Sequence, residues 1–188
     1  TTGNHIIDGG ITILSAAAMA PLFNQIQLKT TAPLQPNTVY TITTANISDC
    51  KNNTIGAANK AKTGLPTDPA AAELVINEIL FNPRSNGFDF IEFYNRSNKI
   101  FDAAKLSIAN RNTSGAVSSA KVLSTAPFYI FPGEYVVIAE DADNLSVNYL
   151  VKNQEATLSI SSMPSFPDDE GDVILLNFQG QVTDEVKY

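Results

Sequence analysis

The sequence predicts an all-β protein built as an antiparallel sandwich. Between residues 73 and 188, short stretches rich in Val, Ile, Phe and Tyr recur at close spacing, as strands do. Between these stretches lie clusters of Gly, Pro, Asn, Asp and Ser at 82–87, 111–115, 131–134, 162–171 and 179–180, which are turn-forming residues. This punctuation is typical of an antiparallel sandwich and not of alternating strands and helices.

Each stretch predicts one strand, giving about seven over residues 73–81, 88–95, 105–110, 134–140, 156–161, 172–178 and 181–188. The one helical candidate is 141–152, where Asp143 or Asn144 could cap a short helix that carries Val147, Tyr149 and Leu150. We expect this helix to be a crossover connection and not a core element.

The chain before residue 66 predicts a smaller β module. Residues 23–31 alternate apolar and polar side chains, and residues 37–47 are dense in β-branched ones, so both predict strands. Gly, Pro, Asp and Ala gather in 62–73, as in a short linker. We therefore expect a β module at 1–65, complete or partial, a linker at 66–72 and a second domain at 73–188.

Residue counts exclude several classes of protein. A single cysteine, Cys50, allows neither a disulfide framework nor a multi-thiolate zinc site. Cys50 and His5 are each alone in the sequence, so no nucleophile with a positioned base is indicated, and no phosphate-binding glycine loop is present. We expect no cofactor.

No stretch of the sequence approaches the roughly 18 apolar residues of a membrane-spanning helix. The absence of a leader before Thr1 suggests a mature product or an excised piece.

The formal charge of −7 is unevenly distributed. Residues 1–72 carry 4 basic and 3 acidic side chains, a net of +1, and residues 73–188 carry 8 basic and 16 acidic ones, a net of −8. Because nucleic-acid affinity rests mainly on neutralising phosphates, we expect no nucleic acid as a partner.

Two acidic loops contain the hard oxygen ligands that Ca²⁺ selects. They comprise Glu140, Asp141 and Asp143 in the first loop, and Asp168, Asp169, Glu170 and Asp172 in the second. Neither has EF-hand spacing. We expect solvated loops that keep a sheet edge from pairing and no resident metal, with calcium binding as the open alternative.

Two carboxylates raise the question of catalysis. Since residues two apart in a strand share a face, Glu78 falls in a row with Leu74, Ile76 and Leu80, and Glu92 in a row with Phe88, Phe90 and Tyr94. A buried carboxylate needs a partner, and Arg84, Arg96 and loop amides are the candidates. The alternative is a glycosidase-like pair, which would need a deep groove lined by both acids and by exposed aromatic side chains. We expect no enzyme.

Several ordered motifs carry a resemblance to a known family. They are ELVINEILFNPRSNGFDFIEFYNRSNKIFDAAKLSIAN, then FPGEYVVIAED, then MPSFPDDEGDVILLNFQGQVTDEVKY. Together they closely resemble the lamin tail domain, an immunoglobulin-like β-sandwich also found in secreted bacterial proteins. The positions that match the family pattern are Asn77, Glu78, Asp89, Ile91, Glu92, Asn95, Asp102, Pro132 and Gly133. The resemblance implies that they are fold signatures and not catalytic residues. A tryptophan common in the family is replaced near Leu106.

The segment 33–55 is similar to the C-terminal half of the immunoglobulin-like modules common in bacterial surface proteins. Together the two resemblances imply a secreted or cell-surface protein with a non-catalytic role in interaction or spacing. We expect an extracellular protein or glycan as the partner and a monomer as the oligomeric state. A carboxylate-based hydrolase that uses Glu78 and Glu92, and nucleic-acid binding by analogy with lamin tails, remain as alternatives.

Overall fold

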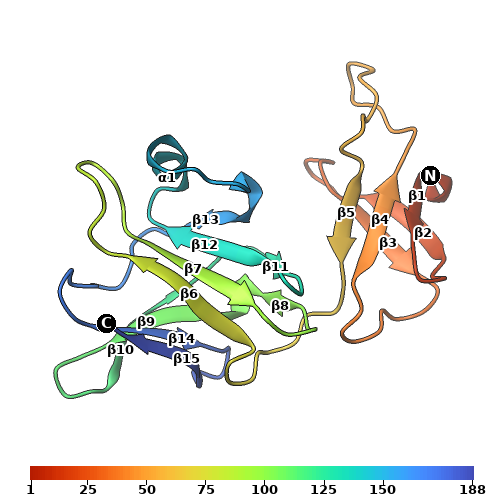
Figure 1. The fold of residues 1–188 in the computed structure, drawn as a ribbon. Helices are drawn as coiled ribbons and strands as arrows, with labels where there is room; N and C mark the ends of the chain where they lie inside the picture. The colour runs from red at the N-terminus through yellow and green to blue at the C-terminus, as the bar shows by residue number, and fades with distance from the viewer. The chain divides into compact units, whose positions relative to one another are not determined.

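The structure is a computed structural model that describes residues 1–188, and these form two compact units, Thr1–Leu65 and Pro66–Tyr188. Strands make up nearly all of the regular structure in both units (Figure 1). The all-β prediction is confirmed. None of the helices is long and apolar enough to cross a membrane.

The first unit contains five strands in two small sheets. Its elements are η1 (Thr2–Asn4), β1 (His5–Ile7), β2 (Ile13–Ala18), β3 (Ile26–Thr30), β4 (Tyr40–Thr44) and β5 (Lys60–Thr63). One sheet has the order β1-β4-β5 and the other is the hairpin β2-β3. Ile7 and Tyr40 are its buried apolar side chains, and Ile6, Leu14 and Phe23 are exposed, so this unit has a small core for its length.

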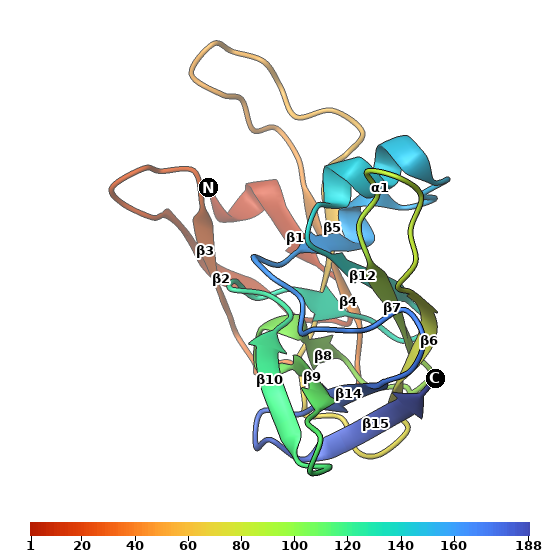
Figure 2. The same ribbon diagram turned by 90° about the vertical axis from the view of Figure 1, so that its left-hand side faces the viewer.

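The second unit is a sandwich of two four-stranded sheets. The first sheet has the order β13-β12-β7-β6, from β6 (Leu74–Leu80), β7 (Phe90–Asn95), β12 (Tyr135–Ala139) and β13 (Thr157–Ser159). The second has the order β10-β9-β14-β15, from β9 (Ser107–Arg111), β10 (Val117–Val122), β14 (Asp172–Leu176) and β15 (Val182–Lys187). A two-residue pair, β8 (Phe101–Asp102) and β11 (Tyr129–Ile130), and the short helices η2 (Ala103–Lys105), α1 (Ala142–Asn148) and η3 (Gln154–Ala156) complete it (Figure 2).

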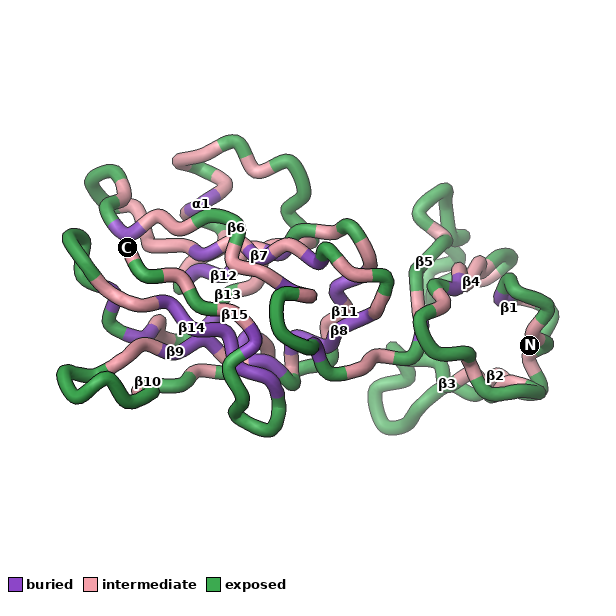
Figure 3. The backbone as a smooth tube through the Cα atoms, turned by 60° about the horizontal axis from the view of Figure 1, so that its bottom comes forward, coloured by how far each residue is buried: buried purple, intermediate pink, exposed green.

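The core of this unit lies between the two sheets, where buried residues concentrate (Figure 3). Alternation along each strand supplies it: in β7, Ile91 and Phe93 are fully buried while Glu92 between them is not. The other large side chains with no exposed surface include Leu74, Phe101, Ile108, Leu123, Ile138 and Leu175. Each such side chain contributes about 1.5–3 kcal/mol by leaving water. Leu106, near the position where the lamin tail family commonly has a tryptophan, is buried among them.

All seven strands predicted after residue 72 have a counterpart, and β8, β10 and β11 were not predicted. The strands β8 and β11 are two residues long, too short for any periodic signal. In β10, the sequence VSSAKV lies at a sheet edge and is mostly solvent-exposed, so it lacks the apolar alternation of a half-buried strand.

The helix prediction is right in kind and wrong in detail. Helix α1 connects β12 to β13, which pair in parallel, so it is the crossover that we expected. Its N-cap is Asp141 and not Asp143 or Asn144, because Asp141 Oδ1 accepts the backbone N–H of Asn144 at 2.9 Å. The side chain that the helix buries is Leu145, whereas Val147 and Leu150 are 84% and 91% exposed.

The segment 66–72, suggested as a linker, is held against the second unit. The N–H of Thr67 donates to the carbonyl of Ile100 at 2.8 Å, and the N–H of Ala72 donates to that of Thr183 at 2.9 Å. Pro69 is buried. Residues with loop composition can thus form an ordered part of a domain when tertiary hydrogen bonds satisfy their backbone groups.

Asn95 and Asp102 form hydrogen bonds at the corners of the sandwich. The Asn95 amide donates to the carbonyls of Lys99 and Ile130 at 2.8 and 3.0 Å, and its oxygen accepts from Ser97. Asp102 Oδ1 accepts the N–H groups of Ala104 and Phe128, each at 3.1 Å. Asp102 therefore caps η2 and also connects β8 to the residue that directly precedes β11.

The turn at Pro132 and Gly133 leads into β12. Gly133 has a φ of +75°, a left-handed conformation that glycine adopts without the steric penalty of a Cβ. Its N–H donates to the carbonyl of Asn95 at 2.9 Å, and the N–H of Asn95 donates to the carbonyl of Glu134 at 3.0 Å. The turn therefore aligns β12 with the end of β7.

Candidate functional site

A bulge in β6 determines where the two acids of the sequence lie. Ile76 pairs with Phe93 and Glu78 pairs with Glu92, so Asn77 is an extra residue in β6 with no opposite number in β7. An extra residue reverses the inward and outward alternation beyond it. Ile79 is therefore opposite the buried Ile91, while Glu78 and Leu80 are on the outer face of the sheet.

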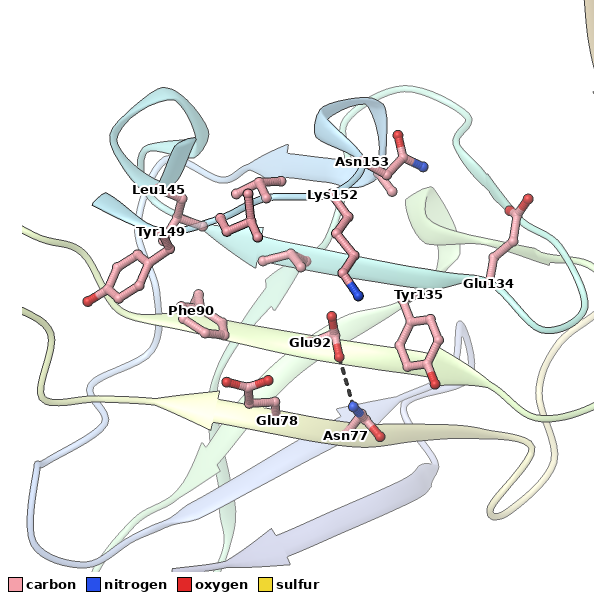
Figure 4. Close-up of a pocket in the computed structure, with 14 residues that line it drawn as sticks. Asn77, Glu78, Phe90, Glu92, Glu134, Tyr135, Leu145, Tyr149, Lys152 and Asn153 are labelled. Carbon is pink, nitrogen blue, oxygen red and sulfur yellow. Dashed lines mark hydrogen bonds between the residues drawn. The ribbon is translucent and has the colours of Figure 1, made fainter. Parts of the chain in front are cut away.

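Glu78 and Glu92 are thus direct cross-strand neighbours, and neither points into the core. The prediction of a partner such as Arg84, Arg96 or a loop amide applied to acids buried in the core, and neither acid is buried. Glu92 accepts a hydrogen bond of 2.8 Å from the side-chain amide of Asn77, and Glu78 is exposed without a side-chain partner. Figure 4 shows both carboxylates on the same side of the sheet, with the Asn77 bond as a dashed line.

Above the two acids is a groove of about 680 Å³. Its floor is the outer face of β6, β7 and β12, and its wall is the crossover that contains α1 and η3 (Figure 4). The lining residues are Asn77, Glu78, Phe90, Glu92, Glu134, Tyr135, Val137, Leu145, Tyr149, Leu150, Val151, Lys152, Asn153 and Ala156. A groove lined by both acids and by aromatic side chains is the feature that the hydrolase alternative of the sequence analysis would need.

Several contacts fix the wall of the groove in place. Leu145 is buried beneath α1, and the ring of Phe90 meets the edge of Tyr149 at a centroid distance of 6.0 Å. The guanidinium carbon of Arg84 lies 5.7 Å from the centroid of the Tyr149 ring, within the range of a cation–π contact. The Asn144 side chain also donates to the carbonyl of Asn86 at 3.0 Å. The crossover is therefore attached to the loop between β6 and β7.

The opposite end of the floor presents an aromatic surface. Tyr135 stacks on Tyr94 with ring centroids 4.5 Å apart and planes inclined by 25°. Tyr135 is 47% exposed, so one face of a pre-oriented ring is open to a ligand. Aromatic rings thus flank the acid pair on both sides, with Phe90 and Tyr149 at one end and Tyr135 at the other (Figure 4).

The groove carries a negative charge. Its lining contains Glu78, Glu92 and Glu134 against Lys152, a net formal charge of −2. Lys152 extends from the crossover toward Glu92 (Figure 4), although no ion pair joins them. Sequence reasoning missed Tyr135 and Lys152 as groove residues, because the pairing of β12 with β7 places Tyr135 on the floor and the crossover places Lys152 above it.

The acidic loops lie elsewhere and do not converge on a metal-binding cluster. Asp141 is used as the α1 cap, and Glu140 accepts the N–H of Met163 at 2.7 Å. No group of three His, Cys, Asp or Glu side chains is arranged to hold a metal ion. Burial, reinforced by the charges of Asp168 and Glu140, raises the pKa of Asp89 above its usual value.

Tyr188 is held in the same region. Burial, followed by the negative charges of Asp89 and Asp168, raises the pKa of Tyr188 to about 12. Its hydroxyl donates to the carbonyl of Pro167 at 2.9 Å, and its ring lies 5.0 Å from that of Phe81. These contacts connect the end of β15 to the core. Tyr188 therefore has a structural role beside the second acidic loop.

The lone His5 and Cys50 are both in the first unit. His5 is a buried residue of β1, and its Nδ1 lies 3.0 Å from the hydroxyl oxygen of Thr44. Cys50 is exposed with a free thiol. Neither contributes to the groove.

A comparison with family models decides what the second unit is. The model of the lamin tail domain matches residues 67–188. The chain belongs to the lamin tail domain family. Among curated proteins, none matches the chain at a significant level. The lamin tail domain is an immunoglobulin-like, non-enzymatic domain family, in agreement with the sandwich found for Pro66–Tyr188.

In this lamin tail domain the family positions divide into two groups. Asn95, Asp102 and Gly133 take part in hydrogen bonds at the sandwich corners, whereas Asn77 and Glu92 are joined to each other on the outer face. The spacing of three between Ile76 and Ile79, in a strand otherwise of period two, is the sequence signal that could have revealed the bulge. The groove follows from that bulge and from the crossover together.

Proposed function

We propose that this chain is a non-catalytic interaction module of a secreted or cell-surface bacterial protein. Its lamin tail domain binds a protein or glycan partner in the groove above β6, β7 and β12, and the first unit spaces this domain from its neighbours. The observation that carries the proposal is the groove itself. A concave surface of about 680 Å³ that combines aromatic rings with convergent polar groups has the composition of ligand sites.

A binding screen tests the proposal on the intact chain. The chain is applied to glycan arrays and to arrays of extracellular proteins, with and without millimolar Ca²⁺. We expect a specific ligand whose binding is lost in Tyr135→Ala and unaffected by removing Ca²⁺. The matched control is Phe178→Ala, which removes an aromatic side chain that is 71% exposed and lies outside the groove. Equal loss in both variants would assign binding to general surface hydrophobicity.

The cellular location has its own test. The extracellular assignment is supported by the resemblance of the sequence to secreted and surface proteins. Fractionation of the source cells, followed by protease treatment of intact cells, should find the protein outside the plasma membrane. Recovery only from the cytoplasm would remove the spacing and attachment role.

A hydrolase is the second candidate, because the groove is lined by Glu78 and Glu92 and by aromatic rings, as a glycosidase site would be. Against it, a catalytic acid is normally set in a buried, apolar surrounding, whereas Glu78 is exposed. The test is hydrolysis of a polysaccharide panel by the wild-type chain and by Glu92→Gln. Turnover abolished in a folded Glu92→Gln variant would replace the binding proposal with an enzymatic one.

Nucleic-acid binding is disfavoured by charge. The region 73–188 carries a net charge of −8, and binding DNA or RNA requires a surface that neutralises phosphates. We expect no retention of the chain on DNA at near-physiological ionic strength. Retention that weakens steeply with added salt would reverse this conclusion.

A further inference from the structure

We propose that the groove of the lamin tail domain recognises a basic segment of polypeptide, with an arginine or lysine side chain placed between Glu78 and Glu92. This inference rests on the proposed function and names the class of ligand. The residues that flank the basic side chain lie along the floor, against Tyr135 at one end and against Phe90 and Tyr149 at the other.

The acid pair provides the first reason. Like charges placed directly opposite one another in a sheet repel, and Glu78 and Glu92 occupy such a pair. No ion pair joins a cation to either acid, and the Arg84 guanidinium lies over Tyr149. An incoming ammonium or guanidinium group would therefore relieve a repulsion that the protein leaves in place.

Lys152 provides the second reason. It is an exposed residue of the crossover whose ammonium group points toward Glu92 (Figure 4). Its direction shows that a long basic side chain can enter the groove from above and reach the acid pair. Because no ion pair holds it there, Lys152 can move aside for a ligand, and it competes with any cation that approaches.

The aromatic rings provide the third reason. The aliphatic parts of arginine and lysine pack well on aromatic faces, and their charged groups interact favourably with such rings. Tyr135 is already oriented by its stacking on Tyr94, so it would lose little freedom on binding. No third His, Cys, Asp or Glu side chain joins the two acids in a metal-binding group, and an anionic ligand would be repelled.

Nuclear magnetic resonance of the intact, ¹⁵N-labelled chain tests the inference even for weak binding. The probe is an acetylated and amidated peptide, Gly-Phe-Arg-Phe-Gly, and the control peptide has Gln in place of Arg. We expect shift changes confined to amides of β6, β7, β12 and the crossover, and affinity for the Arg peptide about fivefold above the Gln peptide, the value of one partly exposed ion pair. This margin should shrink at 0.5 M NaCl.

Four variants sharpen the test. Glu78→Gln and Glu92→Gln should each weaken the Arg peptide about fivefold, while Lys152→Ala should strengthen it. Glu155→Gln is the matched control, because Glu155 is an exposed acid of the same crossover that does not line the groove. It should leave the affinity unchanged. The dispersion of the amide spectrum reports whether each variant is folded.

The possible outcomes separate this inference from the proposed function. Equal affinity for the Arg and Gln peptides would overturn the inference that the groove recognises a basic segment. So would weaker binding of the Arg peptide by Lys152→Ala than by the wild-type chain. Binding of a neutral glycan such as chitohexaose in the groove, with no response to the Arg peptide, would overturn the inference and leave the proposed function standing. Silence toward both peptides and toward the arrays would overturn both.

Discussion

Asn95 gives the most direct test of how the sandwich corners stabilise the lamin tail domain. The residue has no exposed surface, and its amide group fills the space between the loop after β7 and the carbonyl of Ile130 in β11. In Asn95→Ala, the Ile130 carbonyl and the Ser97 N–H would each lose their bond to the Asn95 side chain. Since an unsatisfied buried polar group costs about 1–3 kcal/mol, we expect a loss of about 3–4 kcal/mol in the free energy of unfolding.

Urea unfolding followed by pulsed hydrogen exchange and mass spectrometry measures this loss. Peptides from β7 and β12 report the lamin tail domain separately from the first unit. Asn98→Ala, an exposed position in the same loop, is the control and should change stability by less than about 0.5 kcal/mol. A loss below about 1 kcal/mol in Asn95→Ala would refute the reasoning, because it would mean that water or a relaxed loop satisfies the buried groups at little cost.

Three further changes have defined expectations. Glu78→Gln should stabilise the domain by about 0.5 kcal/mol in low salt, by removing the repulsion with Glu92, and denaturant titrations in 1 M NaCl should show no such gain. Asp89→Asn should be stabilising at pH 7, because burial and neighbouring acids raise the pKa of Asp89 in the folded state. The difference in stability should vanish as the pH falls below 3.8, the ordinary pKa of an aspartate, since both states are then protonated. Gly133→Ala should lower stability by about 1 kcal/mol, since φ is +75° with open space around it, while thermal melts of Gly56→Ala should match wild type.

The sandwich was predictable from sequence because its strands combine apolar alternation with turn residues at their ends. Ile91 and Phe93 alternate with Glu92, and Pro132 and Gly133 mark the turn before β12. The face on which Glu78 lies was not predictable by the same rule, since one inserted residue reverses the alternation. The signal was present in the spacing of Ile76 and Ile79, but it is visible only when a change of face within one strand is considered.

The groove was harder still to predict, because it depends on residues brought together by topology. Lys152 and Tyr135 are separated in sequence by the whole of α1, and the parallel pairing of β12 with β13 is what places the crossover above the sheet. No local pattern encodes that pairing.

The N-cap of α1 shows the same limit of prediction from sequence. Asp141, Asp143 and Asn144 are all good capping residues, and the backbone conformation of the chain after β12 decides which of them becomes the cap.

The bulge at Asn77 lets β6 carry one residue more than β7 without losing its match to that strand. Deleting Asn77 would leave the existing pairs in place, with Glu78 beside Glu92 on the outer face and Ile79 beside Ile91 in the core. The deletion would remove the side-chain amide that donates to Glu92, so the acid pair would remain and lose its one hydrogen-bonded neighbour. Among homologous chains, an alignment gap at this position should therefore occur together with a retained acid at Glu78 and a retained apolar residue at Ile79.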